Sequence, residues 1–369
     1  MKVGTLTFHM VENYGAALQA YALCTVINEM GYDCEIINFT SDQGANVCTF
    51  QWPDDLIKEY GFVTGMLKTI NRWRLGIYSK KNKTRNYAYF IKKYFKISKA
   101  YNSADSLNNL NYDAIVFGSD QIWNAKITQY ATNVYMGSFG ESKSFKKISY
   151  AASSGNEDII GEDEHIKRRL SSFFAISVRE NGLARFIKDK YEINAHVVLD
   201  PVFLLDVTEW KRLKGKLPRK LKKNGYILAY TFDGQSIYNY AIELGRKKNL
   251  PVVLLKWDVS SNLDQAIQLT DSGPIDFLTL IDEAAMVCTT SFHGTAFSII
   301  FKKEIYCLTS GWNGHRIDNL MQKLGKYADD EYDGRKVYHC VPTYFEEKDD
   351  LLKKLRKESL EFLRFSLEG

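Results

Sequence analysis

The stretch VCTTSFHGTAFSIIF, residues 287–301, joins an apolar strand pattern to an apolar helix pattern through one histidine. The run before Thr289 predicts a buried strand, Gly294 predicts a sharp turn, and residues 295–301 have the spacing of a short buried helix. We therefore expect His293 on a turn at the carboxyl edge of a parallel sheet. Ligands bind at that edge because helix N-termini there present unpaired N–H groups to anions.

The side chains around this histidine suit a small anionic ligand. Ser291 and Thr295 supply hydroxyl groups, and Gly294 lets a ligand approach the helix N-terminus, so the segment fits a phosphorylated or carboxylated molecule. A structural interpretation fits equally well. In it, the hydrogen bonds of His293 are satisfied within a turn, and the two hydroxyls cap a helix. The segment alone leaves both interpretations open.

Composition and charge limit the class of protein. A chain of 369 residues predicts two domains of about 180 residues each. The formal net charge of +5 is too mild for a dedicated nucleic-acid binder. Six cysteines without a CxxC pair favour a reducing compartment. No stretch approaches the roughly 20 apolar residues that span a bilayer. We expect a cytoplasmic protein, able at most to bind peripherally at the inner face of the membrane.

Strand and helix patterns alternate along most of the chain, which indicates parallel α/β sheets. Residues 3–8, 17–30 and 34–39 read as a strand, a helix and a strand, and the alternation resumes at residue 112 and again at 226. We predict an N-terminal Rossmann-like domain at 1–205 and a C-terminal one at 206–369, which ends in an amphipathic helix. The two would face each other across a cleft.

A basic segment interrupts the first domain at about residues 41–105, where we predict a helical insertion. Between residues 60 and 104 there are eleven Lys and Arg, interleaved with aromatic residues, and no Asp or Glu. This composition suits an anionic membrane surface or the diphosphate of a lipid-linked sugar. A solvated helical hairpin is an equally good interpretation. Nucleic acid is disfavoured, because no recognised binding motif accompanies the patch.

Six motifs occur in the order found in the polysaccharide pyruvyl transferase family, which the chain resembles from residue 2 to about 325. They are TFHMVENYGAALQAYAL, YDAIVFGSDQIWN, KISYAASSG, ISVREN, VLDPVFLL and VCTTSFHGTAFSIIF. The resemblance implies a fold similar to the GT-B glycosyltransferases. It also implies transfer of pyruvate from phosphoenolpyruvate to a sugar diol, forming a cyclic ketal during surface polysaccharide biosynthesis. Phosphoenolpyruvate would be the donor substrate, and no other cofactor is expected.

That chemistry needs a general acid, a base and fixed cations. His293 is the candidate acid or phosphate ligand, because histidine titrates nearest neutral pH. Arg179 is a candidate anion contact, since its planar fork fits a carboxylate or phosphate, although it could instead pair with Glu180. Some relatives carry Arg at the position of Ser291. Here we expect Arg316 to supply that charge.

The first domain offers further candidates in two loops. Asp120 is a candidate base for the sugar hydroxyl, with helix capping as the alternative. The loop after the first strand could hold the acceptor or the far side of the donor, or could simply be fixed by side-chain bonds and a glycine turn. The candidate binding residues of these loops are Asn13, Tyr14, Gly15, Ser119 and Gln121. No histidine or carboxylate spacing predicts a metal site.

Two other functions remain open on the sequence. A glycosyltransferase that uses a nucleotide sugar could share the scaffold. A scaffold without catalytic activity could bind glycans or membranes through the basic segment.

Overall fold

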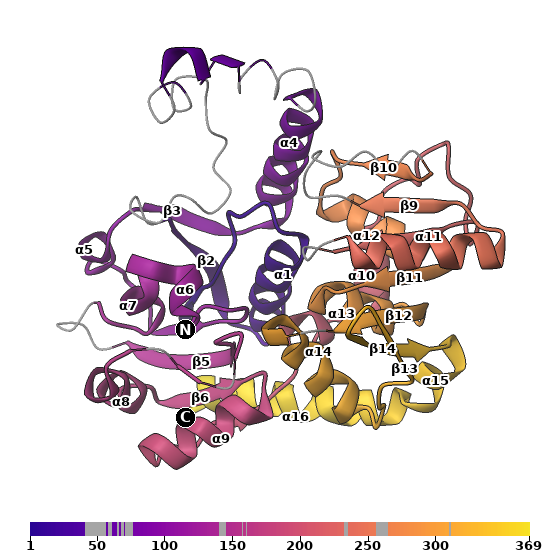
Figure 1. The fold of residues 1–369 in the computed structure, drawn as a ribbon. Helices are drawn as coiled ribbons and strands as arrows, with labels where there is room; N and C mark the ends of the chain where they lie inside the picture. Colours follow the sequence, from indigo (N-terminus) through magenta and orange to yellow (C-terminus); the bar gives the residue numbers. More distant parts are fainter. Residues whose placement is uncertain are drawn as a thin grey trace.

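The computed structural model describes residues 1–40, 57, 61–64, 66–67, 70, 77–139, 145–156, 158–159, 161–231, 235–255, 265–309 and 311–369. This part of the chain forms two α/β units that lie side by side, each built on one sheet (Figure 1). The predicted α/β class with two Rossmann-like domains is confirmed.

The first sheet is parallel throughout and has the described strand order β3-β2-β1-β4-β5-β6-β7. Its central strands are apolar on both faces because helices cover both. The strands are β1 (Lys2–Leu6), β2 (Asp33–Phe39), β3 (Ile97–Tyr101), β4 (Ala114–Phe117), β5 (Lys146–Ala152), β6 (Ala175–Val178) and β7 (His196–Val197). Its helices are α1 (Tyr14–Glu29), α4 (Ile77–Tyr94), α5 (Ala104–Leu107), α6 (Ala125–Thr128), α7 (Thr132–Tyr135), α8 (Asp163–Ser171) and α9 (Asn181–Tyr191), with 3-10 turns at Gln129–Ala131 and Pro201–Phe203.

The second sheet repeats this order and adds an antiparallel hairpin at one edge. Its described order is β10-β9-β8-β11-β12-β14-β13, with β14 antiparallel to β12. The strands are β8 (Ile227–Tyr230), β9 (Val252–Leu255), β10 (Ile267–Leu269), β11 (Met286–Thr289), β12 (Glu304–Thr309), β13 (Asp330–Tyr332) and β14 (Arg335–Cys340). The helices are α10 (Val207–Arg212), α11 (Ser236–Lys248), α12 (Pro274–Asp282), α13 (Phe292–Ile300), α14 (Gly311–Lys323), α15 (Pro342–Glu347) and α16 (Asp349–Glu368). In the described part of the chain, no helix is long and apolar enough to cross a membrane.

The C-terminal helix α16 crosses from the second unit to the first (Figure 1). The Ser359 hydroxyl accepts a hydrogen bond from the backbone N–H of Leu199 at 3.0 Å. Arg356 donates to the backbone oxygens of Phe203 and Leu205 at 2.6 and 2.7 Å. The helix therefore fastens onto the first unit, although it follows the second in sequence. The predicted boundary at residue 205 falls between the last strand of the first sheet and the first strand of the second.

The predicted helical insertion at 41–105 is wrong at its C-terminal end. Residues 97–101 form β3, which pairs with β2 at the edge of the first sheet. An edge strand leaves one side exposed, so Ser98 and Lys99 are compatible with it and weaken its strand pattern. The helix α4 fits the prediction, whereas residues 41–56 and most of 58–76 lie outside the described residues.

Aromatic side chains hold the two units together beside the predicted cleft. The Tyr14 ring stacks on Tyr87 of α4 at 5.6 Å between centroids and on Phe277 of α12 at 4.9 Å. Tyr230 at the end of β8 lies at 5.6 Å. These rings bury a large apolar area and fix α1 against both α4 and the second unit.

Candidate interdomain active site

The strand orders place two loops opposite each other at the domain junction. In each sheet the order reverses beside the first strand, between β1 and β4 in one and between β8 and β11 in the other. Ligands of open α/β sheets bind outside the carboxyl ends of strands at such points. The loop after β4 carries residues 119–121, and β11 leads into α13, so both enter the same junction.

The structure corrects the predicted turn at Gly294. Helix α13 begins at Phe292, and the Ser291 hydroxyl caps it by accepting from the backbone N–H of Gly294 at 3.3 Å. His293 therefore lies in the first turn of the helix. Glycine is required at position 294 because a Cβ atom there would lie 2.4 Å from Oγ1 of Thr289.

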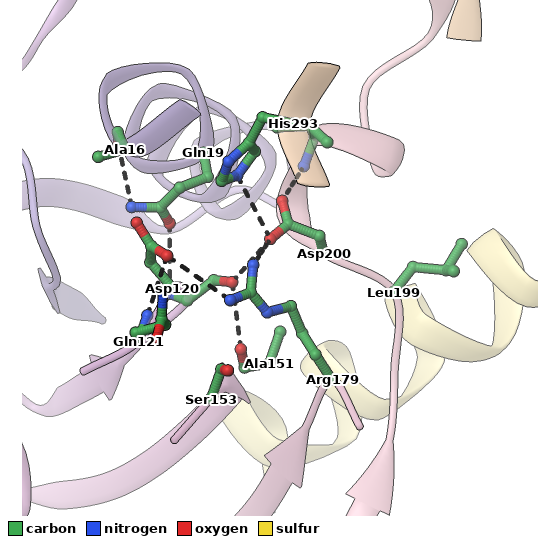
Figure 2. Close-up of polar contacts among 12 residues, drawn as sticks. Ala16, Gln19, Asp120, Gln121, Ala151, Ser153, Arg179, Leu199, Asp200 and His293 are labelled. Atoms are coloured by element: carbon green, nitrogen blue, oxygen red, sulfur yellow. Dashed lines mark hydrogen bonds and ion pairs between the residues drawn. The ribbon is translucent and has the colours of Figure 1, made fainter. Parts of the chain in front are cut away.

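His293 reaches across the junction and lies against the first helix of the other domain. A Cβ atom on Gly15 would be 2.0 Å from Nδ1 of His293, so only glycine leaves room for the imidazole. The other ring nitrogen, Nε2, lies 3.8 Å from Oδ2 of Asp200. Figure 2 shows the ring between α1 and this carboxylate. His293 is 5% exposed, so its contacts replace water on both sides.

Asp200 is the centre of the polar network (Figure 2). Its Oδ2 accepts from Nη1 of Arg179 at 2.7 Å and from the Ser119 hydroxyl at 3.0 Å. Its Oδ1 accepts from the backbone N–H of Val202 at 3.1 Å, which caps the turn before the second domain. One buried carboxylate thus joins the carboxyl end of β6, the loop after β4 and the histidine of α13.

Two further carboxylates face the Arg179 guanidinium. Asp120 Oδ1 lies 3.6 Å from Nη2, and Glu180 Oε1 lies 3.8 Å from Nε. Each is held by a second contact, because Asp120 accepts from the N–H of Gln121 at 2.9 Å and Glu180 from the Ser153 hydroxyl at 2.7 Å. The structural alternative for Arg179, pairing with local carboxylates, is therefore present in the structure.

The second domain adds two cations through α14. With the Gln121 amide oriented so that its oxygen faces Arg316, this oxygen lies 3.3 and 3.2 Å from Nη1 and Nη2. Lys323 donates to the backbone oxygen of Arg179 at 3.1 Å. The Phe292 ring of α13 covers the Arg179 guanidinium at 4.8 Å. Three cations from both domains thus surround one point of the junction.

A small cavity of about 20 Å³ lies at this point, enough for one water molecule. Its charged lining comes from Arg179, Glu180, Asp200, Arg316 and Lys323. His293 does not line the cavity itself but touches Asp200, which does. Several buried polar atoms here make no hydrogen bond within the described part of the chain: Nε2 of His293, Nε and Nη2 of Arg179, and Oε2 of Glu180. Such atoms are those that a polar ligand would satisfy.

Burial and neighbouring charges set the protonation of the site. Burial lowers the pKa of His293, although Asp200 and Asp120 act in the opposite direction. Burial would raise the pKa of Asp120, but Arg179, His293 and Arg316 outweigh it, and the pKa is lowered. Burial raises the pKa of Glu180. It lowers the pKa of Lys323 to about 8, despite the attraction of Glu180. Groups whose pKa values are displaced in this way cluster at functional sites.

The structure brings some predicted site residues together and gives others packing roles. His293, Arg179, Arg316, Asp120, Ser119, Gln121 and Gly15 belong to one continuous network. The remaining candidates have capping or packing contacts: Asn13, Tyr14, Ser291, Gly294 and Thr295. The Asn13 side chain caps α1 by accepting from the N–H of Ala16 at 3.2 Å, and the Thr295 hydroxyl donates to the backbone oxygen of Ser291 at 3.0 Å.

Four residues of the network were not predicted from the sequence. Asp200 lies in the motif VLDPVFLL, whose pattern indicates no role for it, and Glu180 is predicted only as a partner for Arg179. Gln19 binds the N–H of Ser119 at 3.3 Å, and Lys323 sits one turn after Leu320 on an amphipathic helix. A polar residue directly before proline at a strand end was the one available signal, and it pointed to Asp200. Within the described residues, no group of three His, Cys, Asp or Glu side chains could hold a metal ion.

Similarity to solved structures supports the fold. A putative UDP-N-acetylglucosamine 2-epimerase from Listeria monocytogenes has a TM-score of 0.53 at 10% identity, with 98% of this chain and 90% of that chain covered. UDP-GlcNAc 2-epimerase from Neisseria meningitidis, bound to UDP-GlcNAc, has a TM-score of 0.50 at 12% identity, with 98% and 94% covered. At these identities the likeness shows the fold alone, which is two Rossmann-like domains side by side.

Sequence comparison identifies the family. No curated protein is significantly similar to the chain. Residues 13–311 match the family described as polysaccharide pyruvyl transferase, a span that starts at the cap of α1 and includes Asp120, Arg179, Asp200 and His293. It ends five residues before Arg316. Because this match covers most of the chain, the protein belongs to the polysaccharide pyruvyl transferase family.

Proposed function

We propose that the interdomain site transfers pyruvate from phosphoenolpyruvate to two hydroxyls of a sugar. In this reaction C3 of the donor gains a proton, one sugar hydroxyl adds at C2, and the second closes the ring as the C–O bond to phosphate breaks. One hydroxyl proton replaces the proton given to C3, and the other leaves with the phosphate. The observation that carries the proposal is the cluster of Arg179, Arg316 and Lys323 beside His293. Arg179 and His293 lie within the family match, and Arg316 and Lys323 follow it.

The three cations would hold the donor's carboxylate and phosphate. Phosphoenolpyruvate carries about three negative charges, so it needs fixed cations and N–H donors. In the structure Asp120, Glu180 and Asp200 face the Arg179 guanidinium, and the cavity of about 20 Å³ is smaller than phosphoenolpyruvate. The donor therefore enters when the two domains separate, and its anionic groups then compete with these carboxylates for Arg179.

His293 would deliver the proton to C3. Burial lowers the pKa of this histidine, so the ring is mainly neutral before the donor binds. The arriving negative charges favour the protonated imidazole. Donor binding would thus load the acid, while Asp200, close to Nε2, stabilises the positive charge. Asp200 acts here as a positioning residue, because it acts through His293 and Arg179.

The acceptor would enter from the loops of the first domain. Asp120 is the candidate base, since its pKa is lowered by Arg179, His293 and Arg316 against the effect of burial, and it remains ionised near neutral pH. Ser119 and Gln121 lie beside it and could bind sugar hydroxyls. We propose a lipid-linked sugar as acceptor, presented at the inner face of the membrane during exopolysaccharide or capsule assembly.

The test combines donor binding with phosphate release. The protein is incubated with phosphoenolpyruvate and a panel of glycan acceptors, while calorimetry measures donor binding alone. We expect binding without acceptor, and phosphate release that requires an acceptor. His293→Gln should abolish release, and the matched change at the exposed His165 should leave it intact. Absence of binding and of release with every acceptor would refute the proposal. Thermal protection by nucleotide sugars instead of phosphoenolpyruvate would favour a glycosyltransferase.

A further inference from the structure

Exposed apolar side chains gather in one short stretch of the sequence outside both sheets. Phe62, Val63, Met66, Leu67 and Ile70 are 69%, 69%, 40%, 62% and 51% exposed. Thirteen large hydrophobic side chains are exposed in the described part of the chain. Five of these thirteen fall within nine positions of the sequence. In Figure 1 this indigo piece lies beyond the end of α4 that is farther from the sheets. Monomeric proteins rarely expose such a cluster unless it binds something.

The sequence spacing of the five side chains is that of one face of a helix. At about 100° per residue, positions 62, 63, 66, 67 and 70 fall within an arc of about 140°. The described residues among them are helical. An apolar stripe of this width belongs to a surface helix that buries one face against an apolar partner.

The neighbouring helix α4 adds positive charge. Its inner face packs Lys83, Tyr87 and Phe90 into the body of the protein, whereas Arg85, Tyr89, Lys92 and Lys93 are exposed on the outer face. The chain as a whole is almost balanced, with 49 basic and 44 acidic residues, yet residues 60–104 contain eleven basic residues and no acidic one. Positive charge is therefore concentrated in this part of the sequence.

We infer that the side chains of Phe62, Val63, Met66, Leu67 and Ile70, together with the outer face of α4, form a surface that binds anionic phospholipid bilayers. The apolar stripe would enter the boundary between head groups and acyl chains, and the cations would lie among the lipid phosphates. Exposed Tyr89 has the amphipathic ring that suits this interface. Nucleic acid would use the cations but leave the apolar stripe in water, so the stripe favours the bilayer. The inference goes beyond the proposed activity and does not depend on it.

Vesicle flotation of the full chain, without substrate, tests this surface. The vesicles are phosphatidylcholine alone, or with about one third phosphatidylglycerol. We expect binding to the anionic vesicles that weakens at about 1 M salt. Phe62→Ser with Leu67→Ser should reduce binding at least about tenfold. Phe365→Ser is the matched control, because Phe365 is 68% exposed on α16, and should bind like the wild type.

A second pair of variants, one test and one control, measures what positive charge contributes to vesicle binding. Lys92→Glu with Lys93→Glu should weaken binding about 25-fold or more, since each cation near the surface contributes about fivefold. The same reversal at Lys247 and Lys248, exposed at the end of α11, should have little effect. Circular dichroism verifies that each variant is folded. Failure of the wild type to float, or equal losses in test and control variants, would overturn the inference. Binding to a single-stranded oligonucleotide that is unaffected by Phe62→Ser, without vesicle binding, would also overturn it.

Discussion

Nδ1 of His293 occupies the space that a side chain on Gly15 would fill, since a Cβ atom there would lie 2.0 Å from it. Two motifs from opposite ends of the family match thus meet in one contact. The glycine of the first helix sets how closely the second domain can approach, and therefore where the histidine lies relative to Asp200.

Gly15→Ala should impair catalysis more than stability. The new methyl group pushes the imidazole away, and a displacement of about 1 Å at a reacting group lowers the rate on the order of 100-fold. Overpacking should also lower the free energy of unfolding by about 1–3 kcal/mol. Gly4→Ala is the control, because its Cβ would lie 2.6 Å from Cδ1 of Ile37 in the core of the first domain. Urea titration gives the folded fraction of each variant, and phosphate release gives its activity. The prediction is wrong if both variants lose the same activity per folded molecule.

Asp200→Asn should move the pH profile of activity. Burial lowers the pKa of His293, and the Asp200 charge raises it, so removal of that charge lowers the pKa further. If protonated His293 is the acid, the alkaline fall of kcat/KM moves to lower pH in the variant. Activity at neutral pH should fall on the order of 100-fold.

Asp206→Asn is the control for this change, because Asp206 is an exposed helix cap six residues away. The Asp200 variant should also lose about 3–5 kcal/mol of stability, since Arg179 would stay buried without its nearest carboxylate. A uniform loss of activity at every pH, with the alkaline limb unmoved, would indicate that Asp200 is only structural.

Donor affinity should fall between pH 7 and pH 9 because of Lys323. Burial lowers the pKa of this amine to about 8, so it is mainly charged at pH 7 and mainly neutral at pH 9. Loss of one charged donor should weaken phosphoenolpyruvate binding about tenfold in calorimetry. Lys323→Arg, which keeps its charge, should show a flat profile, and Lys323→Met should bind weakly at both pH values. An equal fall in donor affinity between pH 7 and pH 9 in the Lys323→Arg variant would rule out Lys323 as the cause.

Tyr14 should prove to be a packing residue. Its ring stacks on Tyr87 and Phe277, and its hydroxyl makes no hydrogen bond within the described part of the chain. Tyr14→Phe should leave both stability and donor affinity almost unchanged. Tyr14→Ala should lower the free energy of unfolding by about 3–5 kcal/mol, because it opens a cavity between the domains. A large loss of acceptor binding in the phenylalanine variant would restore the predicted role in substrate binding.

Strong apolar patterns allowed much of the fold to be predicted. The strands at residues 114–117 and 286–289 are buried on both faces, so their sequences are continuous apolar runs. The edge strand β3 was missed because Ser98 and Lys99 dilute its pattern. The path of α16 was also missed, since an amphipathic helix shows which face is buried but not which domain buries it.

Residues of the site could be predicted where they lie in a sequence motif whose residue types suit the reaction. His293, Arg179 and Asp120 stand at strand ends or helix starts, so their approach follows from topology. Asp200 was overlooked because its importance comes from Ser119, Arg179 and His293, which are distant in sequence. The position of Gly294 inside a helix was mistaken for a turn, because the reason for glycine there is the close approach of Thr289.

Transfer of the pyruvyl group in heavy water distinguishes ketal formation from sugar transfer. Phosphoenolpyruvate labelled with carbon-13 is incubated in deuterium oxide with the protein and an accepted glycan, and the product is examined by NMR and mass spectrometry. Protonation of C3 predicts one labelled ketal per phosphate released, with a methyl group that carries one deuterium, and His293→Gln should form none. Transfer of a sugar from a nucleotide donor, with phosphoenolpyruvate left unchanged in the presence of every acceptor, would rule out pyruvyl transfer.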